Sequence, residues 1–175
     1  MKTNILAALI AVAVTSPLMA NAADGTITFT GEVTANTCTV KVNEGASTNT
    51  VDLASVSASQ LSASGATAMP TEVRIALSAC STGLTSTRAF FEAGPNVTAA
   101  THNLKNNGTA TNVEVQLLTP ASTVIKIGDT SQRSAAGTTV TDGAAVMTYQ
   151  AQYYATGAAT AGTVDTSVTY SIDYL

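Results

Sequence analysis

An alternating segment close to the start of the chain constrains its fold more than any other feature. From Gly25 to Val33 the odd positions hold glycine or apolar residues, and the even positions hold Thr or Glu. A period of two is typical of a β-strand with one apolar and one polar face. The segment 168–174 at the other end alternates in the same way. Both ends are therefore predicted to lie in or beside a sheet, but the pattern leaves open whether the first strand pairs with its own chain or with another.

Residues 1–22 are predicted to be a secretory signal rather than part of the fold. Lys2 supplies the positive start, residues 5–14 form an apolar run, and Ala20-Asn21-Ala22 fits the small-x-small cleavage rule. The apolar run is too short to cross a bilayer, which takes roughly 20 residues. We therefore expect residues 23–175 to be exported.

Length and charge exclude several classes of function. A mature chain of about 150 residues favours one domain with a core of its own. The sequence holds 7 Lys and Arg against 11 Asp and Glu, and it has no Trp. Because no cluster of basic residues is present to displace counterions from phosphates, nucleic acid is not an expected partner. Binding to anionic lipid is disfavoured for the same reason, and no direct membrane insertion is expected.

Two cysteines, Cys38 and Cys80, are present. In an oxidising compartment the simplest interpretation is one disulfide, which would stabilise the fold by roughly 4 kcal/mol in the chain-entropy model. A pair of metal ligands is the alternative, but it needs more His or Cys, and His102 is the single histidine. We expect His102 in a surface loop. No nucleophile or carboxylate constellation can be assigned to it, so neither an enzyme nor a bound cofactor or metal is expected.

The rest of the sequence predicts short strands separated by Gly, Asn, Asp, Ser and Pro. Such spacing favours an antiparallel sandwich of the immunoglobulin type. Asn106-Asn107-Gly108 and Asp142-Gly143 are hairpin-type turn signals, and residues 55–64 could be a helical turn or a loop. The predicted strands are 26–34, 37–42, 49–53, 71–78, 87–92, 112–118, 122–127, 145–154 and 166–174.

Six short motifs, in order, resemble those of one known family. The most specific is the run from Tyr149 to Gly162, which reads YQAQYYATGAATAG. The others are Thr30-Gly31-Glu32-Val33 followed by Cys38, Val51-Asp52-Leu53, Ile75-Ala76-Leu77 followed by Cys80, Gly108 to Leu117, and the penultimate Tyr174. With these motifs the chain resembles the major subunit of type 1 fimbriae, a pilin of the chaperone–usher pathway.

This resemblance implies an all-β, incomplete immunoglobulin-like sandwich that lacks its last strand. It divides the chain into a signal (1–22), an N-terminal donor-strand extension (23–36) and a pilin domain (37–175). The missing strand leaves a groove, which a periplasmic chaperone fills first and the extension of a neighbouring subunit fills later, at an outer-membrane usher. The protein would then be a structural subunit of a surface fimbrium, built as a homopolymer that supports adhesion.

The resemblance also assigns roles to particular residues. The alternating apolar positions of the extension would insert into the groove, and the C-terminal strand would line the groove and bind the chaperone. A minor tip adaptor or a sugar-binding module of the same pilus is the alternative function, because only Ala23 and Asp24 precede Gly25 in the extension. The donor residues are Gly25, Ile27, Phe29, Gly31 and Val33, and the groove residues are Val168, Tyr170, Ile172 and Tyr174.

Overall fold

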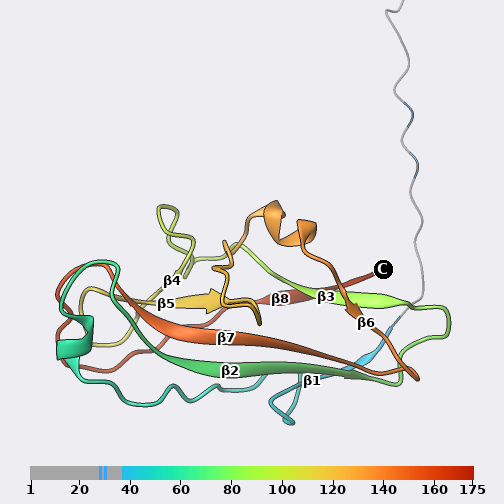
Figure 1. The fold of residues 1–175 in the computed structure, drawn as a ribbon, viewed down its shortest axis with the longest axis horizontal. Coiled ribbons are helices and arrows are strands. Elements are labelled where there is room, and N and C mark those ends of the chain that lie inside the picture. The colour runs from blue at the N-terminus through green and yellow to red at the C-terminus, as the bar shows by residue number, and fades with distance from the viewer. Residues whose placement is uncertain (1–27, 29, 31–36) are drawn as a thin grey trace, which may run out of the picture. The chain divides into compact units, whose positions relative to one another are not determined.

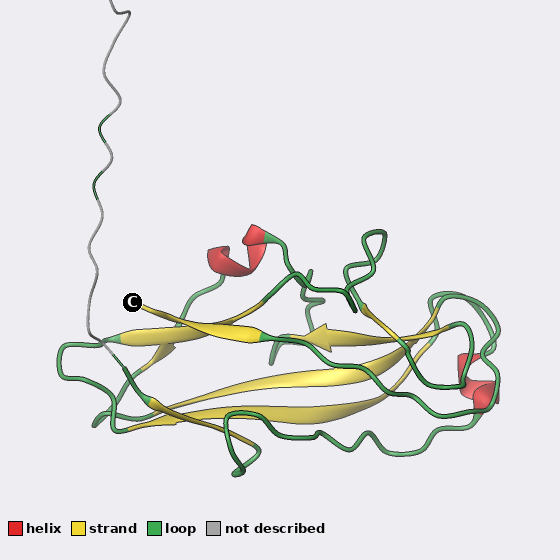
Figure 2. Cartoon of the chain, turned by 180° about the vertical axis from the view of Figure 1, so that it is seen from behind, coloured by secondary structure: helices red, strands yellow, loops and turns green. Residues whose placement is uncertain are grey.

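The computed structural model describes residues 28, 30 and 37–175, and the statements below concern these residues. The predicted signal and nearly all of the predicted strand 26–34 lie outside them. Residues 37–175 form two antiparallel sheets, with two short 3₁₀ turns as the only helical elements of this part of the chain (Figures 1 and 2). Among the described residues, no helix is long and apolar enough to cross a membrane.

The larger sheet has five strands in the order β1-β2-β7-β5-β4. The smaller sheet has three strands in the order β6-β3-β8, so that β8 forms one edge of it. The 3₁₀ turns are η1 (Ala58–Leu61) and η2 (Thr130–Ser134). The strands are β1 (Thr39–Val42), β2 (Thr67–Ser78), β3 (Ser86–Phe91), β4 (Leu104–Lys105), β5 (Val113–Leu118), β6 (Thr138–Thr139), β7 (Ala145–Ala155) and β8 (Tyr170–Tyr174).

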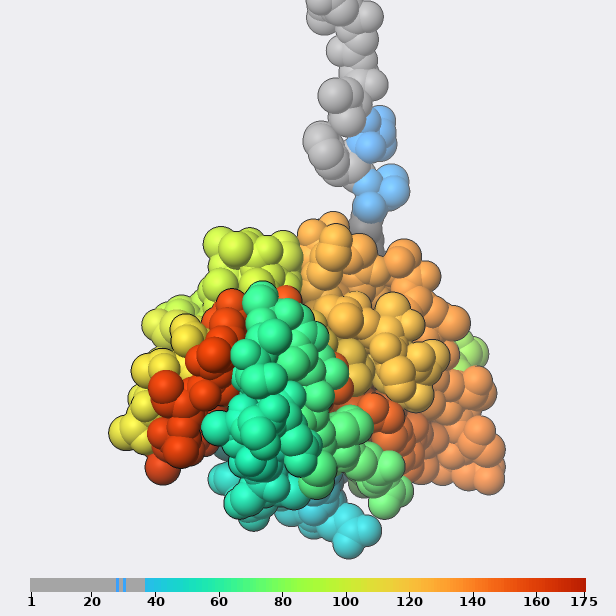
Figure 3. Space-filling model, turned by 60° about the vertical axis from the view of Figure 1, so that its left-hand side comes forward, coloured from blue at the N-terminus to red at the C-terminus, as the bar shows by residue number. Residues whose placement is uncertain are grey.

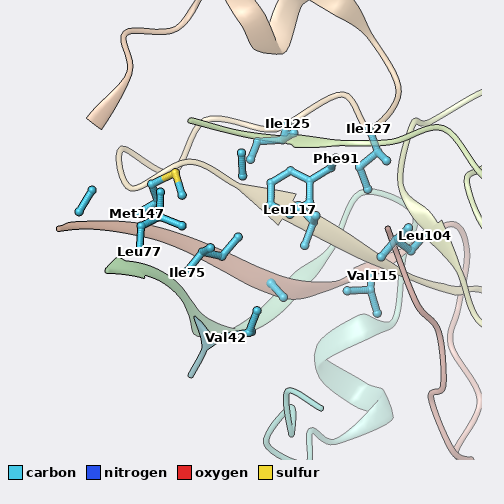
Figure 4. Close-up of a cluster of buried hydrophobic side chains, with 13 residues drawn as sticks. Val42, Ile75, Leu77, Phe91, Leu104, Val115, Leu117, Ile125, Ile127 and Met147 are labelled. Carbon is cyan, nitrogen blue, oxygen red and sulfur yellow. The ribbon is translucent and has the colours of Figure 1, made fainter. Parts of the chain in front are cut away.

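The core lies between the two sheets and follows the period of two in the sequence. Ile75 and Leu77 of β2 and Met147 of β7 are at most 2% exposed, and they belong to the same cluster of buried side chains as Phe91 of β3 (Figure 4). Along β7 every odd residue from Ala145 to Ala155 is turned inward or half-buried. Burying a large aliphatic side chain contributes about 1.5–3 kcal/mol, so these layers account for much of the stability of the sandwich.

Two predicted strands are wrong, and two short strands were not predicted. Residues 49–53 and 122–127 contain no strand, although Ile125 and Ile127 of the second segment are buried in the core. The segment 122–127 makes only an isolated bridge between Val124 and Leu118. The apolar pattern of this segment therefore indicates which side chains are buried. It does not indicate a ladder of main-chain hydrogen bonds. The strands β4 and β6 have two residues each, which is too short to produce a periodic signal.

The predicted turn at Asp142-Gly143 is confirmed. Both residues have positive φ, 50° and 70°, and the flanking Thr141 and Ala144 exchange two main-chain hydrogen bonds of 2.9 Å. Two consecutive positive φ values are those of a type I′ turn, which favours Asp-Gly because glycine has no Cβ to clash. The signal at 106–108 lies instead in a longer loop between β4 and β5.

The predicted disulfide is present and joins Cys38, just before β1, to Cys80, just after β2. Beside it, Ser81 donates its main-chain N–H to the carbonyl of Thr37 at 3.0 Å, and the N–H of Thr37 donates to the Ser81 hydroxyl at 3.1 Å. The bridge and these hydrogen bonds fix the start of the edge strand β1 on β2.

The outer face of the smaller sheet carries an ionic cluster. Asp173 of β8 accepts hydrogen bonds from Arg88 of β3 at 3.1 Å and from Arg133 of η2 at 3.0 Å, and the guanidinium of Arg133 lies 3.9 Å from the ring centre of Phe90. Burial raises the pKa of Asp173, but the hydrogen bonds and charges of the two arginines outweigh it, so the pKa lies below its ordinary value. The cluster holds η2 against β3 and β8.

Candidate functional site

A groove of about 1160 Å³ runs along the sandwich between β8 and the segment that connects β1 to β2. Val40 and Val42 of β1, Ile75 of β2 and Tyr149 of β7 line it, and all three strands belong to the larger sheet. Figure 3 shows the connecting segment, in teal, lying against the red segment that leads into β8. We name the residues 47–53 the first bank of the groove and the residues 164–172 the second bank, because both ranges line it.

Half-buried and exposed residues alternate along the second bank and along residues 50–53 of the first bank, whose residues 47–49 are exposed. On the first bank Val51 and Leu53 are half-buried and Asp52 is exposed. On the second bank the even residues from Val164 to Ile172 are half-buried, whereas Asp165, Ser167 and Thr169 are exposed. Each bank therefore directs apolar side chains into the groove and polar ones towards solvent, as a strand at the rim of a sandwich does.

The predicted groove residues are placed as follows. Val168, Tyr170 and Ile172 line the groove, but Tyr174, which also belongs to β8, is not among the lining residues of the described chain. Val164 and Thr166 also line the groove and were not predicted to do so, although their alternation with Asp165 was a usable signal. The predicted donor residues Gly25, Ile27, Phe29, Gly31 and Val33 lie outside the described residues.

The main chain of the second bank is paired on one side. Ser86 of β3 and Leu175 exchange two main-chain hydrogen bonds, and Glu92 donates its main-chain N–H to Thr169 at 2.9 Å. Because hydrogen bonding alternates along an antiparallel strand, the odd residues of β8 pair with β3, and the main-chain groups of Tyr170, Ile172 and Tyr174 point away from it. The edge of β8 that borders the groove thus has no strand beside it within the described chain.

In the first bank, the main chain of residues 50–53 lacks partners as well. No main-chain hydrogen bond joins any residue from 50 to 53 to another described residue. Unpaired N–H and C=O groups favour the addition of another strand. The groove is therefore bordered on two sides by main chain that has unused hydrogen-bonding capacity.

Three tyrosines that line the groove, Tyr149, Tyr153 and Tyr170, have a pKa raised by burial, and two of them make hydrogen bonds through the hydroxyl. Burial raises the pKa of Tyr149, whose hydroxyl accepts a hydrogen bond from the N–H of Ala89 at 3.2 Å and whose ring lies edge-on to Phe91. Burial also raises the pKa of Tyr170, whose hydroxyl donates to the carbonyl of Ser47 at 2.7 Å. Tyr149 thus ties the floor of the groove to β3, and Tyr170 reaches across it.

His102 is half-buried rather than a plain surface residue, and its Nδ1 lies 3.1 Å from the carbonyl of Ile127. The N–H of Ile127 donates back to the carbonyl of His102 at 3.2 Å. These contacts give the side chain a structural role in joining two loops. Within the described residues no group of three or more His, Cys, Asp or Glu side chains is arranged to hold a metal ion.

An all-β sandwich with one strand position empty defines the class of incomplete immunoglobulin-like domains, and known structures agree with it. A subunit in the structure of a chaperone–usher pilus superposes with a TM-score of 0.63 at 21% identity, over 91% of this chain and all of the other. The P pilus rod subunit PapA superposes with a TM-score of 0.61 at 19% identity, over 78% of this chain and 99% of the other. At these identities the comparison establishes the fold.

The family follows from the sequence comparisons. The model of the family described as "Fimbrial protein" matches residues 27–175, and the chain belongs to this family. The major fimbrial subunit SMF-1 of Stenotrophomonas maltophilia is 44% identical over 91% of this chain and 97% of its own length. The F17 fimbrial protein of Escherichia coli is 38% identical over 86% and 87% of the two chains.

The type-1 fimbrial protein A chain of Escherichia coli K12 is 32% identical, over 86% of this chain and 83% of its own. These relationships confirm the predicted resemblance and the incomplete immunoglobulin-like fold. The protein is a structural subunit of a pilus and is exported to the cell surface as part of a fimbria.

Proposed function

We propose that the protein polymerises by donor-strand exchange, in which residues 23–36 of one copy occupy the groove of the next. Before assembly a periplasmic chaperone would fill the same groove with one of its own strands, and an outer-membrane usher would be the place of exchange. The alternating pattern from Gly25 to Val33 supports this role, because it presents apolar side chains at the spacing of a strand. The donor positions are Gly25, Ile27, Phe29, Gly31 and Val33.

One observation carries the proposal: the two banks of an apolar groove both have main chain without partners. The second bank offers the even residues of β8, and the first bank offers residues 50–53. An occupant that satisfies both must itself be an extended strand, since only a strand presents N–H and C=O groups along two opposite edges. An apolar small molecule would leave these groups unpaired.

A buried polar atom on the groove wall supports the same conclusion. The hydroxyl of Thr166 is buried and has no hydrogen-bond partner among the described residues, and Thr166 lines the groove. An unsatisfied buried hydroxyl costs about 1–3 kcal/mol. Such an atom is expected where a wall lacks one of its natural neighbours.

The energies are sufficient for a stable fibre. Burying the side chains of Ile27, Phe29 and Val33 would contribute about 1.5–3 kcal/mol each. Roughly eight main-chain hydrogen bonds would add about 1 kcal/mol apiece, net. The gross contribution is near 15 kcal/mol before the costs of ordering the tail are subtracted.

A purely structural function, without catalysis, is part of the proposal. The comparisons name fimbrial subunits, and the groove offers apolar side chains and unpaired main chain rather than a nucleophile with a base. The alternative, a minor tip adaptor or a sugar-binding module, has the same groove but occupies a different position in the pilus. The abundance of the chain in sheared surface fibres separates these two positions.

The decisive experiment compares residues 23–175 with a chain that lacks residues 23–34. The longer chain should form ladders of stable multimers. The shorter one should stay monomeric, unfold easily and regain stability when a peptide spanning 23–36 is added. A shorter chain that is as stable as the longer one and does not respond to the peptide would contradict the proposal.

A pair of single substitutions tests the orientation of the tail. Phe29→Asp should abolish the multimer ladder, because a charge would enter an apolar groove, and it should leave chaperone binding intact. Thr28→Asp places the same charge on the opposite face of the strand and should leave the ladder largely unchanged. Equal effects of the two substitutions would show that the odd face of the tail does not enter the groove.

A further inference from the structure

Tyr170 connects the two banks of the groove. It is the first residue of β8, and its hydroxyl donates a 2.7 Å hydrogen bond to the main-chain carbonyl of Ser47, 123 residues earlier in the sequence. Ser47 and Tyr170 both line the groove. Burial raises the pKa of the Tyr170 hydroxyl.

No other hydrogen bond among the described residues joins the first bank to the second. The first bank is otherwise held by the packing of Leu53 against the core and by local contacts, such as the bond from the side chain of Asn49 to the carbonyl of Val42 at 2.9 Å. The residues from 50 to 53 have no main-chain hydrogen bonds of their own. The separation of the two banks therefore depends, as far as polar contacts go, on one tyrosine.

A groove that takes one strand must keep a defined width. Neighbouring strands lie about 4.8 Å apart, so banks that flank one empty strand position must be roughly 9.6 Å apart. Tyrosine suits this role because its long, rigid side chain turns about only two torsions. Without a tie of fixed length, the first bank could close onto the apolar floor or move outward, and either movement would remove the strand-wide opening.

We propose that Tyr170 is a positioning residue that holds the groove open at the width of one strand before an occupant arrives. This inference rests on the proposed donor-strand exchange and deepens it. Without the hydroxyl, only a fraction of molecules has the banks correctly spaced, and the apparent affinity falls by that fraction. A net worth of about 1 kcal/mol for one hydrogen bond corresponds to a roughly fivefold reduction.

The substitution Tyr170→Phe removes only the hydroxyl, and Tyr174→Phe is its matched control. Tyr174 is on the same strand, does not line the groove and makes no side-chain hydrogen bond within the described chain. Association and dissociation of a fluorescein-labelled peptide spanning 24–34 would be followed by anisotropy, with residues 23–175 at low concentration. A second measurement, ¹⁵N relaxation of the Val51 and Leu53 amides without peptide, reports on the first bank independently of binding.

We expect Tyr170→Phe to slow peptide association about fivefold and to leave the dissociation rate within twofold of the parent. It should also increase the motion of the Val51 and Leu53 amides, while Tyr174→Phe changes neither quantity. An unchanged association rate would refute the positioning role. Faster association would refute it too, because it would mean that the bond closes the groove.

Faster dissociation at an unchanged association rate would also refute it, since the bond would then act only in the complex. The two proposals fail in different ways. If the parent chain does not bind the peptide, donor-strand exchange is refuted. In that case unchanged amide relaxation in Tyr170→Phe would refute the positioning role, and increased motion would support its control of the first bank.

Discussion

Removal of the disulfide should lower the free energy of unfolding by an amount that depends on the length of the loop that the bridge closes. The bridge closes a loop between residues separated by 42 positions, which corresponds to about 4 kcal/mol in the chain-entropy model. In the folded state β1 also pairs with β2 from Thr39 to Val42, and these hydrogen bonds do not depend on the bridge. The double variant Cys38→Ala and Cys80→Ala should therefore keep the native fold but unfold more easily.

Thermal unfolding of the monomeric fraction, followed by circular dichroism, measures this effect. For a domain of this size about 4 kcal/mol corresponds to a fall of roughly 10–15 °C in Tm. The parent chain with reductant should resemble the double variant, and reductant should not affect the variant. A fall of less than about 3 °C would show that the unfolded chain is already restricted. Loss of strand signal at 20 °C would show that the bridge is needed to hold β1 in place. Either result would refute the reasoning.

Three further perturbations test the sandwich itself. Two arginines lower the pKa of Asp173 despite its burial, so the carboxylate contributes its full stabilisation above about pH 4 and loses it as the pH falls through the folded pKa. Asp173→Asn should therefore weaken the fall in stability at acid pH, as measured by denaturant midpoints at a series of pH values. Ile75 is 1% exposed, so Ile75→Ala should lower the free energy of unfolding by about 2–5 kcal/mol. Val146→Ala, on the exposed face, should change it by no more than about 0.5 kcal/mol. Urea titrations measure both values. A Cβ on Gly162 would collide with neighbouring main chain and one on Gly94 would meet nothing within 4 Å, so only Gly162→Ala should lower Tm.

The sequence predicted the sandwich well wherever two faces of a strand differ. The alternation in 71–78, 112–118 and 145–154 identified β2, β5 and β7 to within a few residues. One face of each of these strands is buried and apolar, and the opposite face is more exposed or more polar. The N-terminal extension of β2 to Thr67 was missed. A break in register between Ala68 and Thr71 separates it from the rest of β2, and there Met69 has a φ of 53° and Pro70 has no N–H to donate.

The site was harder to predict, because a groove is formed by residues that are distant in the chain. Three of the four predicted groove residues line it, and all three come from the alternating C-terminal segment 168–174. The first bank and Tyr149 were not assigned to the groove, since no local pattern reports that residue 47 faces residue 170. Such pairing depends on the topology, which a period of two does not encode.

The two wrong strands differ in an informative way. The segment 122–127 alternates at its end, where Ile125 and Ile127 are buried and Lys126 is exposed. Its main chain is engaged inside the molecule: Ile125 donates to Leu117 at 2.9 Å and Ile127 donates to the carbonyl of His102 at 3.2 Å. The segment 49–53 also alternates, but its main chain from 50 to 53 has no partner in the described chain.

Apolar and polar residues alternate in a sequence where one face of an extended segment is buried. A strand, by contrast, is defined by main-chain hydrogen bonds to a neighbouring strand. The segment 122–127 fails to be a strand because its main chain is already bound within the molecule, by Leu117 of β5 and by the loop residue His102, so another chain could not convert it. The segment 49–53 fails because the position beside it is empty, and a strand that entered the groove would complete its ladder. The same reasoning applies to 166–169, where the odd residues are bonded to the chain itself and the even residues are not. An alternating segment with free main chain thus indicates a strand of the assembled polymer, and both such segments border one groove.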